Sequence, residues 1–307
     1  MTHTTSPAVD PLLAVPTPGR RWRRVTLGEV VAVVFAVSLV VASVAPGFLA
    51  PQNPAAVAPL DSFQPPSLAH PFGTDESGRD VYTRIVHGAG SSLLIGLAAT
   101  GIGLATALLL ALVAVFGGRF ADAVVGRTVE VLFAFPALLS ALLVILVLGP
   151  GPVAATVAVG LSTAPGYARI IRTSLLRVRA SGYVESARLL GHSPARIVLR
   201  TILPNALSPL LALATLGVGQ AVVWASSLSF LGLGAQPPAP EWGAMLASAR
   251  VYLTTAWWLT VFPGLLILAT TLATTTIGRS LDARSAGWGQ SGPSGQSGQS
   301  GQSGRPS

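Results

Sequence analysis

The side chains with the most obvious chemical potential form a cluster of opposite charges at Asp75, Glu76, Arg79 and Asp80. Carboxylates this close together could bind a cation. A calcium loop of the EF-hand type, however, needs roughly six oxygen ligands spread over about twelve residues, and this spacing does not supply them. We therefore expect Arg79 to pair with a neighbouring carboxylate within its own loop.

A second charged group lies in an apolar stretch and consists of Asp122, Arg127 and Glu130. Ionisable side chains in a membrane segment usually face a cavity or pair with one another. We expect these three to pair near the membrane boundary rather than to contact a transported solute. The apolar stretches do not contain the repeated carboxylates that a proton relay needs, which disfavours a secondary transporter driven by protons.

Several chemistries are excluded by residue types that the chain lacks. It has no cysteine, and all 19 of its Lys/Arg residues are arginine. A thiolate nucleophile, a cysteine zinc site, the lysine of a P-loop and a lysine Schiff base are therefore impossible. His70, His87 and His192 are too scattered to suggest a metal or catalytic site. If nucleotide energy drives this protein, another subunit must bind the nucleotide.

The overall composition indicates an integral membrane protein. Of the 307 residues, 51% are hydrophobic and 10% are charged, with a mean hydropathy of +0.64. A soluble domain carries about 25% charged residues. The net charge of +8 is more typical of loops retained in the cytoplasm than of nucleic-acid binding.

Six apolar runs are each close to the ~20 residues that a helix needs to cross the hydrocarbon core. They lack the alternation of membrane strands, so we expect an all-α protein with six transmembrane helices. The first run could instead belong to a cleaved signal peptide, but it is longer than the apolar part of such peptides, and Pro46 would follow the cleavage site. The runs are 25–45, 93–116, 124–148, 153–171, 207–227 and 258–277.

The arginines indicate how these helices are oriented. With the N-terminus inside, only Arg79, Arg84 and Arg250 of the 19 arginines lie outside. Because cytoplasmic loops are enriched in basic residues, both termini are predicted to be cytoplasmic. The predicted organisation is a disordered cytoplasmic tail at 1–24, a six-span domain at 25–285 with an external loop at 46–91 and a cytoplasmic loop at 172–204, and a flexible Gly/Gln/Ser tail at 286–307.

The cytoplasmic loop contains a pattern typical of a short amphipathic helix. Tyr183, Ala187 and Leu190 are spaced to share one apolar face. Glu185 is spaced to pair with the arginine three residues later, and Gly191 is placed to end the helix. Such a helix could lie on the lipid surface or dock to a soluble partner.

A second helix is expected directly after this one. Ser193 and Pro194 fit an N-cap followed by a proline in the first turn. Pro204 is expected to end this second helix before the fifth apolar run.

The residues of this loop resemble a known family pattern. Glu185-x-Ala187-x-x-x-Gly191, followed by Leu203-Pro204, is similar to the EAA loop of binding-protein-dependent ABC importer permeases. Serine occupies the middle position of the usual Glu-Ala-Ala. Two external segments, 70–93 and 228–246, resemble the dipeptide/oligopeptide/nickel subgroup, and specifically the second, shorter type of its two permeases.

The resemblance implies a permease subunit that imports dipeptides or oligopeptides and is not itself an enzyme. The implied partners are a second homologous permease, two ABC ATPase subunits that hold ATP and Mg, and an extracytoplasmic substrate-binding protein. The chain itself would bind no cofactor, metal or nucleic acid and would be a multi-pass protein of the cytoplasmic membrane of a bacterium. Import of nickel or another chelate is an alternative, and a secondary transporter is an alternative of a different class.

The resemblance also assigns residues to these roles, and no catalytic residue is among them. The residues implied in coupling to the ATPase are Tyr183, Glu185, Ala187, Arg188, Leu190 and Gly191. The residues implied to face the binding protein are Asp75, Arg79, Asp80, Glu241 and Trp242.

Overall fold

The computed structural model describes residues 26–207 and 210–289. Within these ranges the chain is helical, and its extended pairing is limited to one isolated bridge between Thr74 and Asp80. The all-α prediction is therefore confirmed. The predicted tail at 1–24 lies outside the described residues, as does the predicted C-terminal tail from residue 290 onward. Residues 286–289 continue the last helix instead of belonging to that tail.

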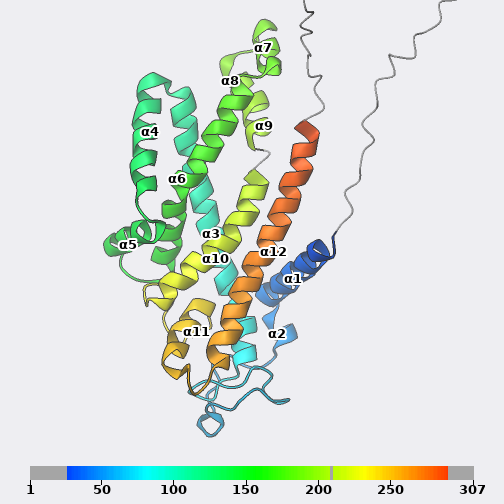
Figure 1. Cartoon of the computed structure of the whole chain (residues 1–307), viewed down its shortest axis with the longest axis vertical. Coiled ribbons are helices and arrows are strands. Elements are labelled where there is room, and N and C mark those ends of the chain that lie inside the picture. Colours follow the sequence, from blue (N-terminus) through cyan, green and yellow to red (C-terminus); the bar gives the residue numbers. More distant parts are fainter. Residues whose placement is uncertain (1–25, 208–209, 290–307) are drawn as a thin grey trace, which may run out of the picture.

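Long helices form the body of the molecule (Figure 1). Helix α3 packs most extensively against α6, and α10 packs against both α12 and α3. Helix α1 lies against α12 and α3 at one side. These helices are α1 (Leu27–Val44), α3 (Val81–Phe116), α6 (Pro152–Arg179), α10 (Leu210–Phe230) and α12 (Trp258–Gly289).

Four helices of the described chain are long and apolar enough to cross a membrane, namely α1, α3, α10 and α12. The next pair, α4 (Gly118–Ala134) and α5 (Ala137–Leu148), adds a fifth span if both are counted together. The predicted span at 153–171 lies within α6, whose hydroxyl, proline, glycine and arginine residues make it less apolar. The count of six and the cytoplasmic position of both termini remain predictions.

The predicted span at 124–148 is not one straight helix. Helices α4 and α5 meet at an angle of 101°. Phe135 separates them in an extended conformation and precedes Pro136, which lacks a backbone N–H and disfavours helix in the residue before it. The proline therefore divides this run into two helices.

Helix α3 begins earlier than the sequence predicted. It starts at Val81, so residues 81–91 of the predicted external loop are helical. Asp80 caps this start, because its Oδ2 accepts a hydrogen bond from the Thr83 backbone N–H at 2.8 Å. The rest of the external loop contains the short helix α2 (Pro46–Leu49) and a 3₁₀ turn at Pro59–Asp61.

Small residues allow α3 and α6 to approach closely. A Cβ added at Gly160 would lie 2.8 Å from the Ala99 carbonyl oxygen, and one at Gly103 would lie 3.0 Å from the Gly160 carbonyl oxygen. Such contacts are typical of helix packing in membranes. Gly101 differs, because a Cβ there would meet nothing within 4 Å. This close contact fixes α6, and α7 follows at its end.

Candidate functional site

Helix α7 (Gly182–Leu189) lies at one end of the molecule, opposite the loop that contains residues 46–80 (Figure 1). It follows the end of α6 after a turn at Ala180 and Ser181. The chain then forms α8 (Pro194–Ile197), a π-helical turn at Val198–Ile202 and α9 (Leu203–Leu207). The predicted helix, break and second helix are therefore present.

Helix α7 is attached to α6 by an apolar cluster. Val184 and Ala187 of α7 are buried together with Ile197, Ile202 and Leu175. A hydrogen bond from the Ser174 hydroxyl to the Ala206 carbonyl, at 3.2 Å, joins α9 to α6. A force applied to α7 would thus reach α6 through packed side chains.

Gly191 ends α7 as predicted. Its φ of +73° is a conformation that glycine adopts without steric cost. The Gly191 N–H donates to the Arg188 carbonyl at 3.0 Å, and the His192 N–H donates to the Ala187 carbonyl at 3.2 Å, which is the Schellman pattern. Ser193 caps α8 as predicted, accepting from the Arg196 N–H at 3.4 Å.

The predicted apolar face of α7 is wrong in part. Ala187 is buried, but its buried partner is Val184, whereas Tyr183 and Leu190 are 49% and 75% exposed. The helix is short, and positions 184 and 187 enter the apolar cluster shared with α6 and α8 while their neighbours turn outward. Leu189, which the sequence analysis missed, is 85% exposed. The outward side of α7 is therefore an apolar tip made of Tyr183, Leu189 and Leu190.

Charged side chains flank this tip. Glu185 and Arg188 are both exposed, and the described residues include no ion pair between them, contrary to the predicted pairing. Water solvates both groups, so the pair has little to gain from contact. An exposed apolar tip bordered by one acid and one base is suited to docking on a protein surface.

Pro204 does not end the second helix where the sequence predicted. Helix α8, the π-helical turn and α9 run on without a break from Pro194 to Leu207, and Val198 and Leu203 at the two junctions both keep the right-handed helical conformation. The proline directly follows the π-helical turn Val198–Ile202, in which the Leu203 N–H donates to the Val198 carbonyl.

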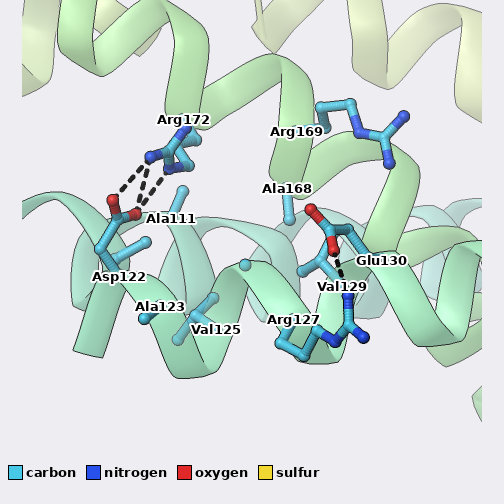
Figure 2. Close-up of a pocket in the computed structure, with 12 residues that line it drawn as sticks. Ala111, Asp122, Ala123, Val125, Arg127, Val129, Glu130, Ala168, Arg169 and Arg172 are labelled. Carbon is cyan, nitrogen blue, oxygen red and sulfur yellow. Dashed lines mark hydrogen bonds and ion pairs between the residues drawn. The ribbon is translucent and has the colours of Figure 1, made fainter. Parts of the chain in front are cut away.

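A cavity of about 420 Å³ lies between α3, α4 and α6 (Figure 2). Arg172 of α6 forks onto Asp122 of α4, with Nε–Oδ1 and Nη2–Oδ2 distances of 2.9 and 2.8 Å. Arg127 pairs with Glu130 at 3.3 Å on the α4 surface. The predicted pairing is confirmed for Arg127 and Glu130, whereas Asp122 pairs with Arg172 of α6, outside the predicted group.

The remaining charge at this cavity belongs to Arg169. Its guanidinium lies over the ring of Phe133, 4.4 Å from the ring centroid, an arrangement favoured by the ring's electron distribution. The described part of the chain has no group of three or more His, Cys, Asp or Glu residues suited to a metal. The charged contacts beside the cavity therefore join α4 to α6.

At the opposite end, Asp75 organises the external loop. Its Oδ1 accepts the backbone N–H groups of Ser77 and Arg79 at 2.8 and 2.9 Å. Arg79 also pairs with the Asp75 carboxylate at 3.5 Å, as predicted. A second partner, Arg84 of α3, was missed by the sequence analysis because it lies outside the cluster of local charges.

Glu241 and Trp242 are also interior residues. Glu241 caps α11 (Trp242–Ala249), accepting the N–H groups of Gly243 and Ala244 at 2.9 and 2.8 Å. The Trp242 indole donates to the Ile85 carbonyl of α3 at 3.0 Å.

The burial of these residues corrects their predicted role. Asp75, Glu241 and Trp242 are only 3%, 2% and 0% exposed, so their side chains cannot form a contact surface themselves. They hold the shape of the external end. Arg79 and Asp80 are half-buried, and Asp80 also contacts His70 at 3.1 Å. For these two residues, a position facing the binding protein remains a prediction.

The sequence comparisons agree on one family. The profile of the binding-protein-dependent transport system inner membrane component family matches residues 99–287. The di/tripeptide transport system permease protein DppC of Pseudomonas aeruginosa is 37% identical over 90% of this chain and 94% of its own length. The glutathione transport system permease protein GsiD of Escherichia coli is 40% identical over 85% of this chain and 86% of its own length.

Solved structures share the fold. A chain of the MetNI methionine ABC transporter in an inward-facing conformation superposes with a TM-score of 0.51 at 20% identity, covering 64% of this chain and 96% of the other. A chain of an amino acid ABC transporter superposes with the same TM-score, covering 66% of this chain and 95% of the other.

Proposed function

The chain belongs to the family of binding-protein-dependent transport system inner membrane components, and from this premise we propose that it is the permease subunit of an ATP-driven importer of dipeptides or oligopeptides. The names of the relatives support the substrate class. The observation that carries the mechanism is α7, which presents an exposed tip to one side and is packed onto α6 on the other.

The proposed mechanism begins with ATP binding to two partner ATPase subunits, which hold ATP and Mg. Their closure moves α7 as a rigid body with the end of α6, because Val184 and Ala187 belong to the apolar cluster that joins α6, α7 and α8. Helix α6 transmits the movement to α3 across the contact at Gly103 and Gly160. ATP drives this change only if the ATPases contact α7 differently in their open and closed states.

The translocation path is proposed to lie between this chain and a second homologous permease. Six spans and two cytoplasmic termini would bring α7 to the ATPases and the loop at 46–80 to the opposite side. There an extracytoplasmic binding protein delivers the peptide. Leu60 and Leu68 are almost completely exposed in this loop and supply apolar surface for that contact.

The proposal is tested by reconstituting this chain with its paired permease, ATPases and binding protein in proteoliposomes. We expect uptake of labelled dipeptide that requires ATP and the binding protein. Uptake driven by an ion gradient without ATP would indicate a secondary transporter. Uptake of nickel in preference to peptides would contradict the proposed substrate and favour the alternative of a nickel importer.

A further inference from the structure

Arg84 is the one arginine of the described residues that is buried, and the proposed mechanism does not use it. It lies in the first turn of α3 and is 4% exposed. A charge is costly to bury unless its partners are well placed, and apolar replacements are often equally stable. Its contacts therefore suggest a role in fixing geometry.

The Arg84 guanidinium joins three separate parts of the chain. Nη1 forms an ion pair with the buried Asp75 carboxylate of the external loop. Nη2 donates to the Pro238 carbonyl at 3.1 Å, in the segment that leads into α11. A lysine ammonium is a single point of charge and cannot reproduce this two-directional fork.

Neighbouring contacts hold the segment before α11 on α3 and also tie the start of α12 to the external loop. The Ser92 hydroxyl of α3 accepts the Trp242 N–H at 3.2 Å and lies 3.4 Å from the Glu241 carboxylate. The Trp258 indole at the start of α12 donates to the Thr74 carbonyl at 3.1 Å. A Cβ at Gly88 would lie 1.8 Å from the Pro240 carbonyl oxygen, so the segment before α11 rests directly on α3.

We propose that Arg84 is a positioning residue that makes the external loop, α3 and the segment before α11 move as one body when the binding protein docks. This inference rests on the proposed function. The exposed Leu60 belongs to the same body, since the Thr74 hydroxyl donates to the Asp61 carbonyl at 2.5 Å. Docking on the loop is thereby transmitted to α3, and from α3 to α6 and α7.

The test compares ATP hydrolysis by the complete complex with and without the peptide-loaded binding protein. In Arg84→Lys we expect the ratio of stimulated to basal hydrolysis to fall about fivefold, which is the lower end of usual coupling effects. Arg250→Met is the matched control, since Arg250 is an exposed arginine between α11 and α12. It should keep the wild-type ratio. A wild-type ratio in an assembled Arg84→Lys complex would overturn the proposal.

A second measurement does not depend on transport. Because the chain has no cysteine, spin labels can be attached to cysteines introduced at the exposed positions Leu60 and Gln236. The distance distribution between them should be narrow in the otherwise wild-type chain and broaden in Arg84→Lys. A distance distribution that is the same in Arg84→Lys as in the otherwise wild-type chain would contradict the proposal about Arg84. Absence of peptide uptake by the wild-type complex would instead contradict the proposed function and leave this distance measurement valid.

Discussion

Gly191 ends α7 in a backbone conformation that other residues adopt only with strain. With φ at +73°, Gly191→Ala is expected to cost about 1 kcal/mol locally and to shift the end of the helix. ATP-driven peptide uptake should fall while the amount of protein in the membrane stays unchanged. Gly182→Ala is the matched control, because a Cβ there meets nothing within 4 Å and its φ is not positive. Equal uptake by the two variants would show that the end of α7 is not important for coupling.

Leu189 should contribute to docking on the ATPase, since it is 85% exposed at the tip of α7. Leu189→Ser is expected to weaken association of the ATPase by about tenfold, the effect of losing one apolar anchor of about 1.4 kcal/mol. Co-purification at increasing salt, or binding to the permease pair in nanodiscs, measures this. Leu199→Ser, in the π-helical turn and also exposed, should bind as the wild type does. If Leu199→Ser weakened ATPase binding and Leu189→Ser did not, the proposed contact at the tip of α7 would be contradicted.

At the scale of residues, local chemistry was predictable and distant pairing was not. The cap at Gly191 and the cap at Ser193 depend on backbone groups only a few residues away, so sequence spacing was sufficient. Arg84 meets Asp75 and Pro238 only because the fold brings them together. The burial of Arg84 could not be predicted from the sequence for the same reason.

Among the helices, the contact between α3 and α6 should tolerate no added volume. Gly103→Val is expected to destabilise the folded chain by about 1–3 kcal/mol, because even a Cβ would lie 3.0 Å from the Gly160 carbonyl oxygen. Gly101→Val, on the same helix, faces open space and should have little effect. Thermal unfolding in detergent, followed by fluorescence size-exclusion chromatography, compares them. Similar melting temperatures for Gly103→Val and Gly101→Val would contradict the close packing of α3 against α6 at Gly103.

The helices were predictable in type, while their ends depended on details of individual residues. Hydropathy identified the apolar runs but could not show that Asp80 starts α3 before the apolar run begins. It gave the run 124–148 as one span and could not give the angle of 101° between α4 and α5. It also could not reveal which side of the short α7 would face α6, because tertiary packing decides this.

The whole molecule offers a direct test of orientation, since the natural chain has no cysteine. A cysteine replacing the exposed Leu68 should react with a membrane-impermeant maleimide added outside intact cells. A cysteine replacing the exposed Leu189 should react only after the membrane is opened. Both variants must first be labelled in detergent as a control. Labelling of both positions from the same side would rule out the proposed arrangement.

The number of spans could be predicted only in part from the sequence. Composition alone identified a membrane protein, and the arginine distribution favoured an even number of crossings. The apolar content of the described helices supports four spans, or five with α4 and α5 together. Helix α6 falls short because it combines a membrane run with the arginine-rich end that carries α7.

The bend between α4 and α5 has a consequence for hydration. Helix α4 stops at Ala134, and the last carbonyl groups of any helix have no following N–H of the same helix to meet. In hydrocarbon such oxygens are costly unless water or protein reaches them. Phe133 and Phe135 are both about half exposed there. The bend therefore places aromatic rings beside main-chain oxygens that need a hydrogen-bond donor. In the membrane, water or a polar group of a neighbouring chain is therefore expected to reach the joint between α4 and α5.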